Sequence, residues 1–255
     1  MGHKPLFPYV DYIIMDKNDL IDNKVPHLSL GPRLDAVMSF IRDGTTLADI
    51  GTDHALIPIA AYLSGKCTRA YATDVNSGPV ERARKNVALY GLSDVITCIK
   101  SDGLSWLTET PVSRYDIVIA GMGGETIADI ISKNGLIRTP AVRLILQPMT
   151  KQEKVRLFLA ESGYKTLAEK VVTENGKYYC IICAEYDGAI RNIDDFTAAY
   201  GTPEAIIFTS KTDKESYLSH CIEVLLRRAA GKEAAGLTSS AEREFTKRLK
   251  EYLGT

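Results

Sequence analysis

The chain has 255 residues, with 31 Lys and Arg against 32 Asp and Glu, and a formal net charge of −1. Apolar residues make up 45% and charged residues 25%, which indicates a globular protein of one or two domains. The near-zero charge excludes a uniformly basic nucleic-acid-binding protein, but it does not exclude a local basic patch. No apolar run approaches the roughly 18 residues of a membrane span, and the first residues lack a signal-peptide pattern, so we expect a cytoplasmic protein without a membrane partner.

Five cysteines are scattered along the chain, and this odd number indicates a reducing compartment. Cys180 and Cys183 form a C-x-x-C pair, but they lie in a run typical of a β-strand, where residues three apart face opposite sides. The sequence has no second pair that would complete a zinc site. We therefore expect buried structural cysteines and no bound metal.

From residue 29 onward, short apolar strands alternate with amphipathic helices. The first helix is predicted over Leu30–Ile41, with Pro32 in its first turn. Five strands are predicted, each followed by a turn and a helix: Thr46–Ile50, Arg69–Thr73, Val95–Lys100, Asp116–Ala120 and Val142–Gln147. Continuous apolar strands that alternate with helices predict a parallel sheet with both faces covered.

Local signals mark where several helices begin and end. Gly91 and Gly163 are placed to end two of the helices in a left-handed conformation. Thr150-x-x-Glu153 has the pattern of a capping box that would open the second of these helices.

After that helix, the pattern changes to two strand-like runs, Tyr164–Thr173 and Lys177–Tyr186. Asn175-Gly176 between them predicts a β-hairpin. A parallel sheet that finishes in an antiparallel hairpin is typical of a methyltransferase sheet more than of a dehydrogenase sheet. The predicted fold class is therefore α/β, with a Rossmann-like seven-stranded class I methyltransferase sheet followed by a C-terminal α-helical, coiled-coil-like domain.

Residues 187–202 are predicted to be a linker, and no strand is expected beyond them. Asp213–Ala230 and a helix capped by Ser239-x-x-Glu242 predict an antiparallel helical hairpin, either a solvated helix pair or an appendage that contacts RNA. The predicted division is an N-terminal extension over 1–28, a methyltransferase domain over 29–188 and a helical hairpin domain over 189–255.

The segment Leu47–Ala55 is an apolar strand that ends in a turn with a single glycine, Gly51. A glycine at this place lets a ligand approach the backbone closely. The turn lacks the G-x-G-x-x-G pattern, and the carboxylates of Asp49 and Asp53 would repel a pyrophosphate but attract a cationic sulfonium. The sequence therefore favours S-adenosylmethionine over NAD. Asp53 could instead be a helix N-cap, or serve in both ways.

The next strands also end in polar residues at the same edge of the predicted sheet. Asp74 can accept hydrogen bonds from both hydroxyls of a ribose, and Asn76 can cap the following helix or line the pocket. Asp102 can accept a hydrogen bond from an adenine amine. The predicted cofactor-binding residues along these strand ends are Asp49, Gly51, Asp74, Val75, Asn76, Ser101, Asp102, Gly103, Gly121 and Met122.

The fourth strand leads into the run Gly121-Met122-Gly123-Gly124. The three glycines leave room for a flat substrate to approach the backbone, although a plain strand-to-helix turn is the alternative. Gln147 ends the fifth strand on the rim of the same crevice.

These segments together resemble one family. The runs ADIGTDHA, ATDVNSGPVERARKNV, SDGL, DIVIAGMGGETI and LILQPM are similar to the bacterial tRNA adenine-N1 methyltransferase family TrmK, over roughly residues 28–186. The resemblance implies transfer of a methyl group from S-adenosyl-L-methionine to N1 of adenosine at position 22, in the D-arm of tRNA. It places Gly51, Asp74, Asp102 and Gly121 at the ends of donor-binding motifs.

Arg33 matches a basic position typical of the family, and it either pairs with the carboxylate of the donor or is a plain surface arginine. The resemblance places Asp53 and His54 where base and methyl group meet, and Gly123 is the third candidate catalytic residue. Because neutral adenine has a lone pair at N1, no strong base is needed. Asp53 is therefore expected to act through electrostatics and positioning.

N1 lies on the Watson–Crick edge of adenine, so a paired or stacked adenosine must be extruded before it reacts. Tyr90 and Trp106 are candidates for stacking on the extruded base, although core packing is favoured for Trp106.

Other functions stay open. The chain could methylate another RNA or a small molecule, it could be a non-catalytic nucleotide-binding module, or it could be a structural protein that oligomerises through its C-terminal helices. The expected partner is tRNA, without a membrane or a metal, and the oligomeric state is open, with a monomer included.

Overall fold

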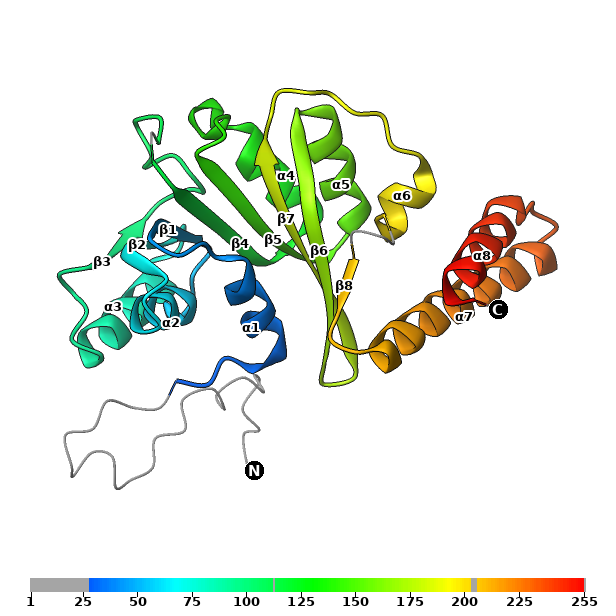
Figure 1. The fold of residues 1–255 in the computed structure, drawn as a ribbon, viewed down its shortest axis with the longest axis horizontal. Helices are drawn as coiled ribbons and strands as arrows, with labels where there is room; N and C mark the ends of the chain where they lie inside the picture. The colour runs from blue at the N-terminus through cyan, green and yellow to red at the C-terminus, as the bar shows by residue number, and fades with distance from the viewer. Residues whose placement is uncertain (1–27, 112, 203–205, 255) are drawn as a thin grey trace, which may run out of the picture.

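The computed structural model describes residues 28–111, 113–202 and 206–254. Apart from its last residue, the predicted N-terminal extension over 1–28 lies outside the described residues. The centre of the fold is an eight-stranded sheet with the strand order β3-β2-β1-β4-β5-β7-β6-β8 (Figure 1).

Five strands form the parallel part of the sheet, as the alternation of strands and helices predicts. They are β1 (Thr45–Ile50), β2 (Cys67–Asp74), β3 (Ile96–Lys100), β4 (Tyr115–Gly123) and β5 (Val142–Thr150). β1 pairs with β2 and β4, β2 also pairs with β3, and β4 also pairs with β5. We call the edge where β1–β5 end the carboxyl edge, and the edge where they begin the amino edge.

The predicted hairpin consists of β6 (Tyr164–Glu174) and β7 (Lys177–Tyr186). The two turn residues have positive φ angles, 51° at Asn175 and 71° at Gly176. A type I′ turn requires this conformation, and Asn-Gly adopts it readily. β7 pairs antiparallel with both β5 and β6, which gives the mixed sheet that the sequence predicts.

The eighth strand is a difference from the prediction of seven. β8 (Ile206–Phe208) pairs in parallel with Glu169–Val171 of β6, beyond the point where no strand was expected. The predicted linker before it contains the short helix α6 (Asp195–Tyr200), whose N-cap Asp194 accepts a hydrogen bond from the Thr197 N–H at 2.7 Å. A strand of three residues shows no clear alternation, so only its pairing with β6 defines it.

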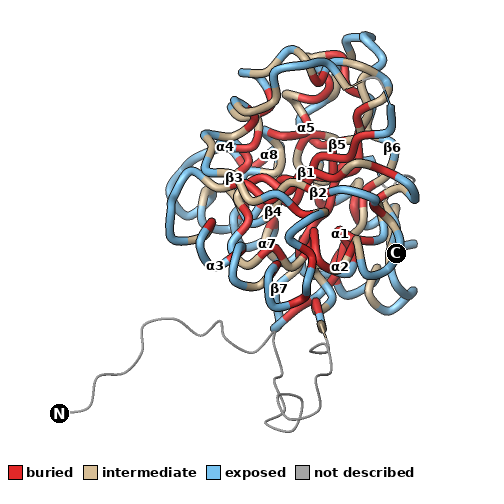
Figure 2. The backbone as a smooth tube through the Cα atoms, turned by 90° about the vertical axis from the view of Figure 1, so that its left-hand side faces the viewer, coloured by how far each residue is buried: buried red, intermediate tan, exposed pale blue. Residues whose placement is uncertain are grey.

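Helices cover both faces of the sheet. One face carries α1 (Gly31–Phe40), α2 (Leu56–Leu63) and α3 (Ser77–Leu89), and the other carries α4 (Gly124–Ser132), the 3-10 helix η1 (Gly135–Ile137) and α5 (Gln152–Glu161). Neighbouring strand residues alternate between the two cores, so that Leu47 packs on one face and Ala48 on the other. Figure 2 shows the resulting buried layer running through the centre of the molecule.

The helix-end signals are partly confirmed. Gly91 and Gly163 follow their helices with φ angles of 68° and 78°. The predicted capping box at Thr150 is wrong, because β5 continues to Thr150 and the N-cap of α5 is Lys151, whose side chain makes no capping bond. Ser239 is the N-cap of the last helix, but its side chain makes no capping bond either.

The C-terminal helices α7 (Lys211–Ala234) and α8 (Ser240–Leu253) pack on each other as the predicted hairpin, and Figure 1 shows them beyond β8. Leu218 and Leu225 of α7 belong to the same buried core as the sheet. Arg248 of α8 donates to Asp194 at 2.6 Å, which ties the hairpin to the start of α6. Among the described residues, no helix has the length and apolar character needed to cross a membrane.

Candidate functional site at the carboxyl edge

Gly51 shapes the turn after β1. Its φ is +78°, and its N–H and that of Thr52 both donate to the carbonyl oxygen of Thr73 in β2, at 2.7 and 2.8 Å. A Cβ on residue 51 would overlap the methyl group of Met122, so both the backbone angle and the space favour glycine. The side chain of Met122, at the end of β4, thus lies next to the bend after β1.

Asp49 is a buried carboxyl group at the end of β1, only 6% exposed. Burial raises the pKa of this group to about 6; a hydrogen bond with the Thr52 side chain lowers it in part, and the charge of Asp74 raises it again. No positive charge in the described part of the chain is among the causes. A cationic ligand at this place would supply the balancing charge.

Asp53 lies beyond the bend and does not cap α2, whose N-cap is Ala55 with a φ of 54°. Its Oδ1 accepts a hydrogen bond from Nε of Arg82 at 2.8 Å, and its Oδ2 lies 3.5 Å from Nε2 of His54. The side-chain amide of Asn86 donates to the His54 carbonyl at 3.0 Å. The N-cap interpretation of Asp53 is therefore wrong. Sequence reasoning missed Arg82 and Asn86, which sit on the helix that follows the second strand.

The ends of β2 and β3 lie side by side. Oδ1 of Asp74 accepts the N–H of Asn76 at 2.7 Å, and the Ser101 N–H donates to the Asp74 carbonyl at 2.9 Å. Asn76 is the N-cap of α3 without a side-chain capping bond, and Val75 is 54% exposed. Asp102 is exposed at the start of the next turn. The residues predicted to hold a nucleoside are therefore adjacent.

The glycines at the carboxyl edge differ in their surroundings. Gly121, with a φ of +80°, has no atom within 4 Å of an added Cβ, so it faces open space. Gly123 has an ordinary φ of −66° as the N-cap of α4, and Gly103 lies in the turn after β3. Gly124 is buried, and an added Cβ would overlap the Lys151 carbonyl oxygen. Gly124 packs the ends of β4 and β5 together, a role that the sequence analysis did not assign.

Gln147 is a buried side chain that connects β5, β4 and α1. Its Oε1 accepts hydrogen bonds from the Gly121 N–H at 3.1 Å and from Nη1 of Arg33 at 2.9 Å, and its Nε2 donates to the Pro148 carbonyl at 3.1 Å. Nε of Arg33 lies 3.6 Å from a carboxylate oxygen of Glu174, and the Arg33 side chain is 16% exposed. Arg33 therefore belongs to the carboxyl edge and is not a plain surface arginine.

The two aromatic candidates for base stacking have other partners. Trp106 packs against the core, with its ring 4.6 Å from the ring of Tyr71. Tyr90 is buried at the end of α3, so it cannot stack on a base in the crevice.

A cavity of about 230 Å³ lies away from this edge, beside α5, β6 and α6. The buried Arg156 there uses all five of its N–H groups, which bond to Glu169, to the carbonyls of Ala198 and Ala199, and to Sγ of Cys180. The charges of Arg156 and Glu169 are thus paired within the protein. We therefore interpret this cavity as a structural feature and assign no ligand to it. Within the described residues, no group of three His, Cys, Asp or Glu is placed to hold a metal ion.

The carboxyl edge thus offers acidic groups, open space at a glycine and one partly covered arginine. Asp74 can bind a ribose, Asp49 favours a cation and Arg33 can meet a carboxylate. A nucleoside that carries a cationic centre and a carboxylate fits this set, whereas a pyrophosphate would face the charge of Asp49, which has no cationic partner among the causes of its pKa shift.

Comparison with known proteins gives matches over the same region. A family model described as a methyltransferase domain matches residues 30–182. The tRNA (adenine(22)-N(1))-methyltransferase of Bacillus subtilis is 36% identical over 168 residues, which are 63% of this chain and 70% of that protein. The structure of M. capricolum TrmK in complex with S-adenosyl-homocysteine has a TM-score of 0.72 and 27% identity, covering 88% of this chain and 98% of that chain. The B. subtilis M1A22 tRNA methyltransferase TrmK has a TM-score of 0.68 and 29% identity, covering 89% and 100%.

Proposed function

The chain belongs to the TrmK family of tRNA (adenine(22)-N(1))-methyltransferases, and from this premise we propose that it transfers a methyl group from S-adenosyl-L-methionine to N1 of adenosine 22 in tRNA. The sequence resemblance to this family is confirmed, as is the Rossmann-like class I methyltransferase fold. The proposed location is the cytoplasm, where a tRNA substrate is available.

The observation that carries the proposal is the buried carboxyl of Asp49 beside the single-glycine bend. Burial raises the pKa of Asp49, and the charge of Asp74 raises it further, with no positive charge among the causes. S-adenosylmethionine, when bound, supplies a methyl group on a positively charged sulfur. A site of this charge stabilises that ligand and disfavours a diphosphate.

We assign the donor to the strand ends, with Asp74 at the ribose, Asp102 at the adenine, and Gly121 and Arg33 at the amino-acid end. The complete set of proposed donor-binding residues is Arg33, Asp49, Gly51, Asp74, Val75, Asn76, Ser101, Asp102, Gly103, Gly121 and Met122.

The proposed catalytic residues are Asp53, His54 and Gly123. The lone pair of adenine N1 attacks directly, so the protein need not remove a proton before transfer. The adenine becomes positively charged as it reacts, and the carboxylate of Asp53 stabilises this charge. Arg82 and His54 hold that carboxylate in place. Gly123 lets the base approach the backbone, and alignment of base and methyl group supplies much of the acceleration.

We propose that the α7/α8 hairpin contacts tRNA, and that it forms a second unit over 189–255 beside a methyltransferase unit over 29–188. Its exposed basic side chains include Arg228, Lys247 and Lys250. Changing these three residues to Gln should weaken tRNA binding and make it less salt-dependent, with a slope smaller by about 0.7–0.9 for each lost phosphate contact. Unchanged affinity and slope in a gel shift would contradict an RNA role for the hairpin.

Mass spectrometry of nucleosides tests the activity. Incubation of unmodified tRNA with the protein and S-adenosylmethionine should produce 1-methyladenosine, and pretreatment of the tRNA with RNase should abolish it. Methyl transfer that survives RNase would favour a small-molecule substrate, and donor binding without any transfer would favour a non-catalytic module.

A further inference from the structure

We propose that Glu174, in the β6–β7 hairpin, is a positioning residue for the methyl donor, and that it acts through Arg33 and Gln147 on the backbone at Gly121. This inference rests on the proposed function, because it takes S-adenosylmethionine as the ligand of the carboxyl edge.

The start of α1 depends on Glu174. The N-cap Leu30 makes no side-chain capping bond, and the first turn of α1 contains no acidic residue. Instead, Oε1 of Glu174 accepts the backbone N–H of Arg33 at 3.3 Å, although the two residues are 141 positions apart. Glu174 is only 6% exposed, so this contact is sheltered from solvent. A carboxylate supplied by the hairpin thus stabilises the positive end of the helix.

The same hairpin fixes the side chain of Arg33. Oε2 of Glu174 lies 3.6 Å from its Nε, and its guanidinium carbon lies 5.7 Å from the centre of the Tyr179 ring. Nη1 donates to Gln147, and no described residue accepts a hydrogen bond from Nη2. The planar group is therefore held on several sides, in a geometry that can bind a carboxylate.

Gln147 connects Arg33 to β4 by hydrogen bonds. Its Oε1 accepts from Arg33 and from Gly121 at once, so the position of Arg33 is coupled to that of the Gly121 N–H through one buried amide. Gly121 borders the open space at the end of β4. The carboxylate and the ammonium of the donor's amino-acid end both require partners in fixed positions. The series of contacts from Glu174 to Gly121 fixes two such partners, the Arg33 side chain and the Gly121 backbone.

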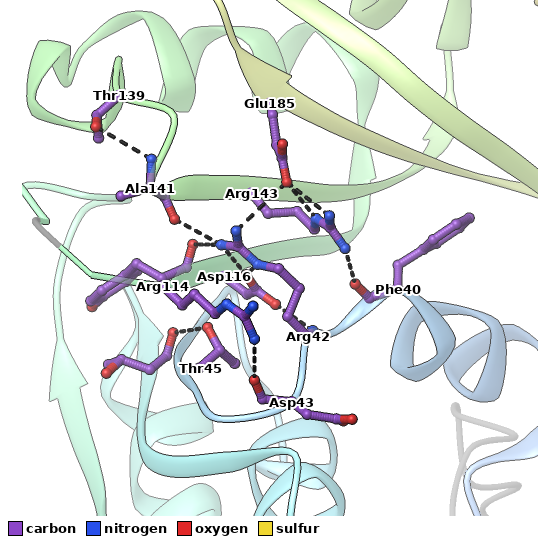
Figure 3. Close-up of polar contacts among 12 residues, drawn as sticks. Phe40, Arg42, Asp43, Thr45, Arg114, Asp116, Thr139, Ala141, Arg143 and Glu185 are labelled. Carbon is purple, nitrogen blue, oxygen red and sulfur yellow. Dashed lines mark hydrogen bonds and ion pairs between the residues drawn. The ribbon is translucent and has the colours of Figure 1, made fainter.

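A matched carboxylate exists at the amino edge. Glu185 of β7 accepts from Nε of Arg143 at 2.9 Å and lies 3.6 Å from Nη1 of Arg42 (Figure 3). It has the same chemistry as Glu174 on the same hairpin, but it lies at the opposite edge of the sheet. If hairpin carboxylates only hold the fold, then the loss of either one should affect stability alone.

The test uses the full chain and measures the dissociation constant of S-adenosylhomocysteine by calorimetry, the KM for S-adenosylmethionine, kcat, and the tRNA affinity. We expect E174Q to raise the dissociation constant and KM about tenfold, with kcat and tRNA affinity within about twofold of the wild type. R33K keeps the positive charge but loses the planar, two-pronged donor geometry of the guanidinium, so it should weaken donor binding to a similar extent. The double variant should be no weaker than the weaker single variant, and E185Q should bind like the wild type.

Wild-type affinity in folded E174Q, or additive losses in the double variant, would overturn the positioning role while leaving the proposed function intact. If E174Q fails to fold, R33K decides by the same measurements, and wild-type affinity in R33K would overturn the inference. If the wild-type protein neither binds the donor nor methylates tRNA, the proposed function and this inference both fail.

Discussion

The two edges of the parallel sheet contain the same kinds of charged residue, but they differ in how completely the charges are paired. At the amino edge, the backbone N–H and Nε of Arg42 each donate to the fully buried Asp116 at 2.7 Å, and Nη2 donates to the carbonyl of Ala141 at 2.7 Å (Figure 3). At the carboxyl edge, Asp49 is also buried, but no cation is among the causes of its pKa shift. Removing one partner of a paired buried charge destabilises the fold, whereas a buried carboxyl without a cationic partner is a candidate place for a ligand.

Helix α1 runs between these two edges. Arg33 lies in its first turn, at the carboxyl edge, and Arg42 follows its end, at the amino edge. Nη2 of Arg42 is bonded within the protein, whereas no described residue accepts from Nη2 of Arg33. Two arginines around one helix thus differ in how completely their N–H groups are bonded within the described part of the protein.

The largest expected effect is on stability, at the amino edge. D116A removes the fully buried carboxylate that accepts two hydrogen bonds from Arg42 and leaves only the more distant Glu185, so the free energy of unfolding should fall by roughly 3–5 kcal/mol. Urea denaturation measures this loss, and the folded fraction should still bind S-adenosylhomocysteine with wild-type affinity. A loss of unfolding free energy below about 1 kcal/mol, or a large change in the affinity for S-adenosylhomocysteine, would contradict the distinction between a structural amino edge and a ligand-binding carboxyl edge.

At the carboxyl edge, D53A should affect chemistry more than binding. The Asp53 side chain is 60% exposed, so its loss should cost little stability, whereas kcat should fall about 100-fold because the charge on the reacting adenine loses its stabilising carboxylate. A tritium-methyl assay measures kcat, and calorimetry measures the affinity for the donor. Equal losses in kcat and in donor affinity would refute the positioning role of Asp53.

The raised pKa of Asp49 predicts a dependence of stability on pH. The pKa is about 6 in the folded protein against about 3.9 in the unfolded chain, so the folded state binds the proton more tightly. Stability of the ligand-free protein should therefore fall by about 3 kcal/mol as pH rises from about 3 to about 7. D49N should remove this component, and an unchanged profile in D49N would show that Asp49 is not its source.

Donor binding should have the opposite dependence. A sulfonium favours the ionised form of Asp49, so S-adenosylmethionine should bind more tightly as pH rises from 5 to 7. S-adenosylhomocysteine, whose sulfur is uncharged, should show a weaker dependence. Calorimetry over this range measures both ligands, and identical pH profiles for them would argue against a contact between Asp49 and the sulfonium.

The smallest predicted effect compares two glycines that flank β1. G51A places a Cβ at a positive φ and against Met122, so it should cost about 1–2 kcal/mol of stability and raise the donor dissociation constant about tenfold. Gly44 at the amino edge has a similar φ of +70° with nothing within 4 Å of an added Cβ. G44A should therefore cost similar stability without any loss of affinity, and a matching loss in G44A would show that the effect is global.

The sequence predicts those features that depend on short segments. The five parallel strands, the Asn175-Gly176 turn and the strand-end positions of Asp49 and Asp74 follow from local patterns, because the strands are buried and their ends share one edge. Glu174 and Arg82 could not be assigned in this way, since their partners Arg33 and Asp53 are 141 and 29 positions away.

The same reason explains the errors in the predicted elements. The capping box at Thr150 has the correct residue types, but pairing with β4 extends β5 through that position. β8 depends on its pairing with β6, and no pattern within three residues reveals that pairing.

The most direct test of the account uses two unmodified tRNA transcripts that differ only at position 22, one with adenosine and one with guanosine. Each is incubated with the protein and S-adenosylmethionine, and 1-methyladenosine is located by mass spectrometry of RNase fragments. We predict one methylated adenosine, at position 22 of the first transcript, and none in the second. Methylation at another position, or equal methylation of both transcripts, would contradict the account.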